Sequence, residues 1–236
     1  MLIDVALNPA EIALLLTRDL SATTCVVFDV LRATSSMVTG LANGVTAIHP
    51  VRTIDEARTL KESLPDAILG GERHGDPVPG FEIGNAPHEY TSLAGRRVIT
   101  TTTNGTVALR ACEGAQRVLV GALLNLQALA EELIRNRPSS VLLVCAGTFE
   151  DFALEDAYAA GMLIQELPET ELTDAAQAAR AVAQSSSTPL ATLLNSRNGK
   201  VLSARGRRAE VEWCAQRSVF TVVGEMQRAV IRPLQC

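Results

Sequence analysis

One stretch of the sequence, TCVVFDVLRATS at residues 24–35, decides the fold. Its first half is apolar and β-branched, which predicts a buried strand over residues 24–30 that ends near one carboxylate, Asp29. A Thr or Ser at positions 34–36 is expected to cap a helix, and Asn43-Gly44 predicts the left-handed end of that helix. A buried strand that leads directly into a helix is the building unit of α/β proteins.

Strand and helix patterns alternate along much of the chain. Further strands are predicted at residues 46–51, 67–69, 97–101, 117–120 and 140–146, and helices at residues 54–64, 104–111 and 123–135. An alternation that repeats every ~20–30 residues is typical of a parallel sheet covered by helices on both faces. We therefore predict a three-layer α/β/α fold with a mostly parallel or mixed sheet.

The character of the sequence changes after Gly147. Ala-rich segments predict helices at residues 154–165, 173–184 and 189–194, and one more strand is predicted at residues 220–223. The Ser- and Thr-rich stretch at residues 185–189 is short, so we interpret it as a turn or connector and not as a domain boundary. The prediction is a single α/β domain over residues 1–236 with a helix-rich portion at residues 150–215.

Composition and charge exclude several classes of protein. Of the 236 residues, 47% are hydrophobic and 20% charged, a balance typical of a folded core and not of disorder. The net charge is −5, and the longest basic run, Arg205–Arg208, is interpreted as a solvated turn, so nucleic acid is not an expected partner. We expect no membrane span and no signal peptide. Five dispersed cysteines without a C-x-x-C pair favour a reducing cytoplasm.

Ligands of open α/β sheets bind beyond the carboxyl ends of the strands. Four segments leave those ends, at residues 29–36, 70–87, 100–105 and 145–156, and they hold most of the unusual side chains of the sequence. The segment at residues 70–87 has little secondary-structure pattern, and its prolines favour a long, ordered, functional loop. We predict that the four segments converge on one site.

Two kinds of binding chemistry are expected at this site. The segment TTTTNG at residues 100–105 lies between a strand and a helix, so its hydroxyl groups and backbone amides favour an anion site, although helix capping explains one or two of them. Carboxylates that suit Mg²⁺ lie at or beyond strand ends: Asp29, Glu72, Glu155 and Asp156. The first turn of a helix explains Glu155 and Asp156 equally well. With only three histidines, a histidine-rich zinc centre is not expected.

Two known phosphatase chemistries do not fit the sequence. The haloacid-dehalogenase type needs a second Asp two residues after the first, and Leu31 stands at that position after Asp29. Cysteine phosphatases need an Arg six residues after the cysteine, and no cysteine here is followed by one. We expect the cysteines to be small buried hydrophobic residues, with Cys145 nearest the predicted site.

Together the motifs resemble one family, the 2-phosphosulfolactate phosphatases (ComB-like). The matching segments cover most of the chain: VFDVLRATS (27–35), GGER (70–73), GFEIGNAP (80–87), TTTNGT (101–106), VCAG (144–147) and LED (154–156). The resemblance implies an α/β fold peculiar to the family, Mg²⁺ dependence, and hydrolysis of (R)-2-phospho-3-sulfolactate to sulfolactate and phosphate, a step toward coenzyme M. The chain departs from the pattern at residues 214–218, where Arg217-Ser218 stands in place of an acidic residue.

The resemblance also implies roles for individual residues. We expect Asp29, Arg32 and Glu72 to be catalytic, and Mg²⁺ to be held by Asp29, Glu72, Glu155 and Asp156. The expected substrate-binding residues are Arg32, Thr34, Ser35, Arg73, Asn85, Thr102, Thr103, Asn104, Gly105 and Cys145. The arginines would clamp anionic groups of a small phosphorylated or sulfonated acid, with a surface salt bridge as the alternative for each. A homo-oligomer is a further expectation.

Other functions stay open at this point. The chain can be a Mg²⁺-dependent phosphatase of another small phosphorylated acid, or a non-catalytic anion-binding homologue. The departure at residues 214–218 is the feature that favours these alternatives. The role of the catalytic carboxylate, as general base or as transient nucleophile, is equally open.

Overall fold

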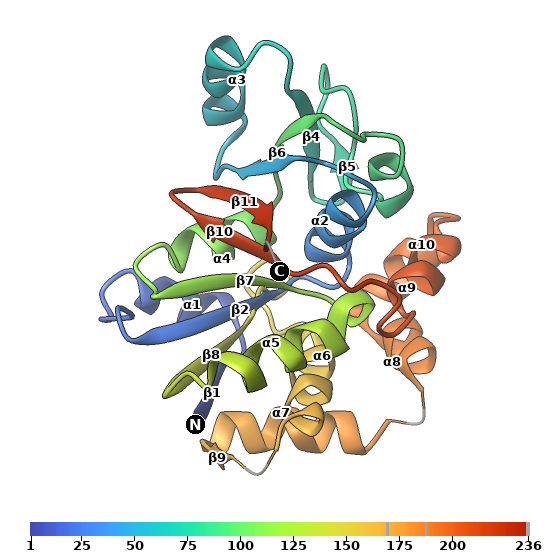
Figure 1. The fold of residues 1–236 in the computed structure, drawn as a ribbon. Helices are drawn as coiled ribbons and strands as arrows, with labels where there is room; N and C mark the ends of the chain where they lie inside the picture. The colour runs from blue at the N-terminus through green and yellow to red at the C-terminus, as the bar shows by residue number, and fades with distance from the viewer. Residues whose placement is uncertain (169, 187, 235–236) are drawn as a thin grey trace.

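The sheet forms the centre of the fold, and helices lie on both of its faces (Figure 1). The computed structural model describes residues 1–168, 170–186 and 188–234. The strand order is β5-β4-β6-β3-β11-β10-β7-β2-β8-β1-β9. The strands are β1 (Leu2–Ala6), β2 (Thr23–Phe28), β3 (Ala47–Pro50), β4 (Ile68–Arg73), β5 (Asp76–Pro77), β6 (Arg97–Thr101), β7 (Arg117–Gly121), β8 (Ser140–Cys145), β9 (Glu171–Leu172), β10 (Gly224–Gln227) and β11 (Val230–Pro233).

Helices connect most of the parallel strands and make up most of the chain between β8 and β10. They are α1 (Pro9–Leu15), α2 (Ala33–Ala42), α3 (Ile54–Ser63), α4 (Gly105–Ala111), α5 (Leu126–Asn136), α6 (Leu154–Glu166), α7 (Asp174–Gln184), α8 (Pro189–Asn195), α9 (Arg197–Ala204) and α10 (Arg208–Cys214), with short 3-10 helices η1 (Pro87–Tyr90) and η2 (Leu123–Asn125). The helix-rich C-terminal portion is therefore present as α6 to α10.

Strand β2 lies between β7 and β8 and is parallel to both. Every residue of β2 is buried, as its apolar sequence predicted. The register pairs Phe28 with Gly121 of β7 and with Cys145 of β8, so the three strands end at the same level. The residues that follow these strands, Asp29 among them, consequently meet at one edge of the sheet.

Side-chain alternation along β2 separates two hydrophobic cores. Val26 and Phe28 belong to the core formed with α5, α6 and α7. Cys25 and Val27 belong to the core formed with α1, α2 and α4. Successive residues of a strand point to opposite faces, so each core lies on its own side of the sheet. This arrangement confirms the predicted three-layer α/β/α fold.

The C-terminal hairpin joins the two parallel parts of the sheet. Strand β10 pairs antiparallel with β7, and β11 pairs antiparallel with β3 through Ile231 and Ile48. The strand predicted at residues 220–223 is wrong, because Phe220 donates its N–H to the carbonyl of Leu124 outside the sheet (2.9 Å), and β10 begins only at Gly224. The hairpin strands contain Gly, Pro and charged residues, so they do not form the apolar run on which a strand prediction depends.

The segment at residues 70–87 begins as a hairpin. Strand β4 continues to Arg73 and pairs antiparallel with β5. The two residues between them, His74 and Gly75, have φ angles of 56° and 86°, as two-residue hairpin turns require. The prediction of one irregular loop over residues 70–87 is therefore wrong for its first part, whereas residues 78–86 contain no helix or strand.

Three further expectations concern the chain as a whole. The connector predicted at residues 185–189 leads from α7 to α8, and Ser187 within it lies outside the described residues. Four cysteines are buried and free, as expected, and Cys236 lies outside the described residues. Across the described ranges, no helix has both the length and the apolar character that crossing a membrane requires.

Replacing Ile231 with Ala is expected to destabilise the protein by about 2–4 kcal/mol, because Ile231 is fully buried at the junction between the hairpin and β3. Urea unfolding measures the change. Val219→Ala is the matched control, because Val219 is 46% exposed and its truncation should change stability by less than about 0.5 kcal/mol. Equal, small effects of the two substitutions would show that the hairpin is not part of the cooperative sheet.

Candidate active site

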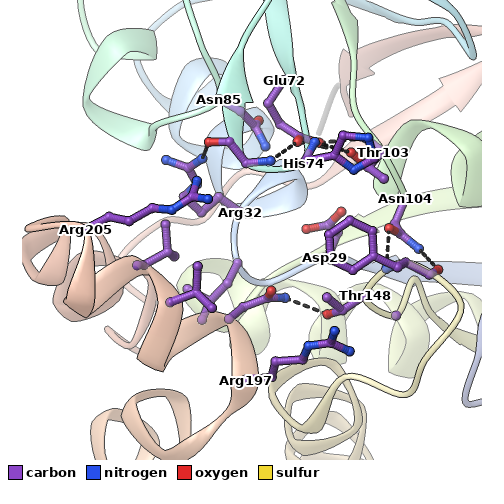
Figure 2. Close-up of a pocket in the computed structure, with 17 residues that line it drawn as sticks. Asp29, Arg32, Glu72, His74, Asn85, Thr103, Asn104, Thr148, Arg197 and Arg205 are labelled. Atoms are coloured by element: carbon purple, nitrogen blue, oxygen red, sulfur yellow. Dashed lines mark hydrogen bonds between the residues drawn. The ribbon is translucent and has the colours of Figure 1, made fainter.

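A cavity of about 260 Å³ opens at the carboxyl edge of the parallel strands. Its walls come from all four segments predicted to converge, through residues 29–32, 72–85, 103–104 and 147–149. A fifth segment, residues 197–205 on and just beyond α9, forms the remaining wall and was not predicted (Figure 2). The structure thus brings together side chains that are far apart in the sequence.

Asp29 lines the cavity and also caps the helix that follows it. Its Oδ1 accepts a hydrogen bond from the N–H of Ala33, the first residue of α2 (3.0 Å). The predicted Thr or Ser cap at positions 34–36 is therefore wrong, because a carboxylate takes that role and α2 begins before these residues. The second oxygen, Oδ2, lies against α4, where a Cβ on Gly105 would collide with it.

The carboxylate of Asp29 is held in surroundings that disfavour its charge. Burial raises the pKa of Asp29 to about 7, and repulsion from Glu72 and Glu155 acts in the same direction. The hydrogen bond from Ala33 and the charge of Arg32 oppose this rise. A half-buried carboxylate with a raised pKa in a cavity is typical of functional sites.

Glu72 connects two walls of the cavity. Its Oε1 accepts a hydrogen bond from the N–H of Thr103 (2.6 Å), and its Oε2 accepts from the hydroxyl of Thr103 (3.1 Å) and from the N–H of Gly75 (2.6 Å). Three donors thus occupy the two oxygens of this buried side chain. Glu72 fixes the turn between β4 and β5 to the loop after β6.

Glu155 and Asp156 lie in the first turn of α6 and do not line the cavity. Asp156 accepts hydrogen bonds from the N–H groups of Val30 (2.8 Å) and Gly147 (3.1 Å), so it ties together the segments that follow β2 and β8. Glu155 accepts one from the amide of Asn198 (2.7 Å), whereas its buried Oε2 has no partner among the described residues. Burial raises the pKa of both carboxyl groups.

The four carboxylates expected to hold Mg²⁺ have different surroundings and do not form one ligand set. In the described part of the chain, no three His, Cys, Asp or Glu side chains are grouped so that they could hold a metal ion. Asp29 and Glu72 line the cavity, and only Asp29 has an oxygen there that receives no hydrogen bond from the described residues. This donor set fits an ion that takes one protein carboxylate and otherwise water and substrate oxygens, as Mg²⁺ often does.

The two expected arginines lie in different places. Arg32 lines the cavity; its guanidinium pairs with Glu210 of α10 and donates to the carbonyl of Gly75 (3.4 Å). Arg73 does not line the cavity, because it donates to the carbonyl of Glu72 (2.6 Å) and to the hydroxyl of Thr101 (2.6 Å). The expectation that Arg73 clamps substrate is thus not supported by its position.

Several of the polar residues expected to bind substrate instead form hydrogen bonds with the backbone. Buried Thr34, Ser35 and Thr102 make hydrogen bonds to the backbone at Asp29, Val30 and Thr106, respectively, and none of the three lines the cavity. By contrast, the expected residues Asn85, Thr103 and Asn104 do line it. Asn104 holds the neighbouring turn, because its amide donates to the carbonyl of Phe149 (2.8 Å) and its Oδ1 accepts from the N–H of Phe149 (3.0 Å).

Cys145 is fully buried in β8 and does not reach the cavity. Burial, with the charge of Asp156 as a smaller cause, raises the pKa of the Cys145 thiol well above its usual value. Only thiolates are good nucleophiles, so this environment makes Cys145 unreactive. Its expected contact with substrate is therefore not supported by its position.

Sequence reasoning missed the wall formed by α9. Arg197, Asn198 and Arg205 line the cavity, although Arg205 belongs to the basic run that we interpreted as a solvated turn. Phe149 was also missed. Its ring stacks on His74 (centroids 5.4 Å apart) and lies 5.5 Å from the guanidinium carbon of Arg197.

Asp29→Asn is expected to stabilise the metal-free protein by about 1–3 kcal/mol near pH 8 and only slightly near pH 4. Between the ordinary pKa of 3.8 and the folded pKa of about 7, the unfolded chain loses the proton of Asp29 first, so wild-type stability falls as pH rises. Asn keeps an acceptor for Ala33 and carries no charge. Urea unfolding in EDTA at both pH values measures the difference; a gain that is the same at both would contradict the raised pKa.

Cys145→Ala is expected to leave kcat/KM within about threefold of wild type, because the thiol neither lines the cavity nor ionises readily. Steady-state phosphate release is the measurement, with thermal unfolding as a check that the protein stays folded. A loss of a thousandfold or more in a folded variant would identify Cys145 as a nucleophile and refute this placement.

Comparison with known proteins agrees with the family resemblance of the sequence motifs. The family model of 2-phosphosulpholactate phosphatase matches residues 11–229. The chain is 40% identical over 203 residues to a protein of Carboxydothermus hydrogenoformans (85% of this chain, 84% of that protein) and 37% identical over 203 residues to one of Deinococcus radiodurans (84% and 85%). Both are named probable 2-phosphosulfolactate phosphatase. The resemblance found in the sequence is confirmed, and this chain belongs to the 2-phosphosulfolactate phosphatase family.

Proposed function

We propose that this chain is a Mg²⁺-dependent phosphatase that hydrolyses the phosphate ester of 2-phospho-3-sulfolactate to sulfolactate and phosphate. One observation supports this proposal most directly. Asp29 lines the cavity, and one of its carboxylate oxygens receives no hydrogen bond from the described residues. The names of the relatives support the substrate. A cavity of about 260 Å³ is at the small end for ligand sites and suits a three-carbon acid.

Asp29 is the residue that would hold Mg²⁺. The ion would supply Lewis-acid stabilisation of the phosphoryl group and a water of lowered pKa. Arg32 contributes a permanent positive charge from the opposite side of the cavity, and its guanidinium has N–H groups beyond those given to Glu210 and Gly75. These N–H groups can donate to a phosphoryl oxygen, which stabilises charge that develops during transfer.

The other residues keep the cavity in one shape. Glu72 holds Thr103 and Gly75 together, so the wall beside Asp29 is formed before substrate binds. Asn198 donates its amide N–H groups to Thr148 (2.7 Å) and Glu155 (2.7 Å). Its Oδ1 is therefore left as an acceptor for a water or a hydroxyl group in the cavity.

The direct test is phosphate release from 2-phospho-3-sulfolactate with Mg²⁺ and then with excess EDTA. We expect turnover that EDTA abolishes and added Mg²⁺ restores. Asp29→Asn should lower kcat/KM at least about 100-fold, because it removes the charge that holds the ion. Asp55→Asn is the control: Asp55 is 94% exposed on α3, away from the cavity, and its loss should leave turnover unchanged.

Two outcomes would overturn the proposal. Turnover that survives both EDTA and Asp29→Asn would show that neither metal nor Asp29 is required. Tight binding of the substrate without any phosphate release would identify the chain as an anion-binding homologue. Faster hydrolysis of another small phosphorylated acid would replace the substrate and leave the proposed chemistry in place.

A further inference from the structure

Three arginines gather around one residue of the β4–β5 turn, Gly75. The carbonyl oxygen of Gly75 accepts hydrogen bonds from Arg207 (2.9 Å) and Arg32 (3.4 Å). The Nη1 of Arg205 lies 3.3 Å from the position that a Cβ on Gly75 would occupy. The three side chains come from the start of α2 and from the end of α9 and the turn after it, so the tertiary fold alone brings them together.

Among the described residues, two carboxylates form ion pairs with these three guanidinium groups, and a third, that of Glu72, accepts the N–H of Gly75 (2.6 Å). Arg32 is 6% exposed and pairs with Glu210. Arg205 pairs with Asp76 (3.0 Å), whose side chain is 66% exposed. An ion pair this open to water contributes about 0–1 kcal/mol, so an incoming anion can share or replace Asp76 at little cost. The cluster therefore has positive charge available to a ligand.

Arginines and the carboxylate of Asp29 lie on different sides of the cavity. Figure 2 shows Arg32 and Arg205 on one side and Asp29 and Asn104 on the opposite side. The two sides are close enough for the charge of Arg32 to act on Asp29. A permanently anionic group of a substrate is repelled by Asp29 and Glu72 and attracted by the arginines.

We propose that Arg205, together with Arg32, forms a subsite for an acidic group of the substrate that is not transferred, a sulfonate or a carboxylate, and that Arg205 determines specificity for substrates carrying such a group. This inference rests on the proposed function. A planar guanidinium can donate two parallel hydrogen bonds, a geometry that suits both carboxylate and sulfonate oxygens. Arg205 lines the cavity, and its one side-chain hydrogen bond among the described residues goes to exposed Asp76, so its other N–H groups can donate to a ligand.

The test compares three phosphate esters that differ in their other acidic groups: isopropyl phosphate has none, 2-phospholactate has a carboxylate, and 2-phospho-3-sulfolactate has a carboxylate and a sulfonate. Arg205→Ala should lower the preference for 2-phospho-3-sulfolactate over isopropyl phosphate, measured as the ratio of kcat/KM values, about 10- to 100-fold. Most of the change should lie in KM, and Arg205→Lys should recover part of it. A loss shared by 2-phospholactate assigns the subsite to the carboxylate, and a loss limited to the third ester assigns it to the sulfonate.

Arg208→Ala is the matched control. Arg208 belongs to the same basic run, but it pairs only with exposed Glu212 and does not line the cavity. Its preference ratio should stay within twofold of wild type. An unchanged ratio in Arg205→Ala would overturn the inference, and so would an equal loss on all three esters, which would indicate a general structural role.

A second measurement separates this inference from the proposed function. Calorimetric titration with 3-sulfolactate, which has no phosphate, does not depend on turnover. We expect Arg205→Ala to weaken this binding about 10-fold or more relative to wild type and to Arg208→Ala. If the wild-type protein releases no phosphate from any ester, the proposed function fails, and the titration still decides the subsite: equal affinity in all three proteins overturns it.

Discussion

The carboxylate of Asp29 is the constraint on which the arrangement of the site depends. One oxygen caps α2 by accepting the N–H of Ala33, and the other lies at the cavity against Gly105 of α4. The carboxylate therefore ties a strand end to the start of α2, packs against the start of α4, and keeps one oxygen that receives no hydrogen bond from the described residues. Its charge is costly in this position, as the raised pKa shows. A cation bound at the free oxygen would offset that cost. The same negative charge therefore destabilises the metal-free protein and would favour the binding of a cation.

The fold determines where the charged side chains around the cavity lie. Acidic residues stand where parallel strands end, because the strands of one sheet deliver their following residues to one edge. Two arginines of the cavity, Arg197 and Arg205, come from the segment at residues 197–205, and a third, Arg32, follows β2. Asp29 and these arginines thus line one small cavity.

The sequence predicted what depends on local pattern. Strand β2, the helix after it and the position of Asp29 follow from an apolar run that ends in a carboxylate. It could not distinguish neighbouring residues on one strand: Glu72 faces the cavity, whereas Arg73 points away, because successive side chains alternate between faces. Among the threonines, Thr103 reaches the cavity, whereas Thr102 is buried and its hydroxyl accepts the N–H of Thr106 in the first turn of α4.

The features that the sequence did not predict depend on contacts between residues far apart in the chain. The hairpin β10–β11 lies in the middle of the sheet although it ends the described chain, and its strands have no apolar run of their own. Arg205 is far in sequence from Gly75, so its place in the cavity depends on how α9 packs and not on its neighbours in the chain. Glu155 and Asp156 were expected as ligands from their position after a strand; their bonds to Asn198, Val30 and Gly147 give them a supporting role that only the tertiary structure reveals.

We propose that Asp29 provides the protein ligand for a divalent cation at this cavity. Titration with Mn²⁺, followed by electron paramagnetic resonance as the free-ion signal disappears, measures that binding without requiring turnover. We expect one Mn²⁺ site in the wild-type protein and its loss in Asp29→Asn at equal protein concentration. Equal Mn²⁺ binding by the two proteins would contradict it.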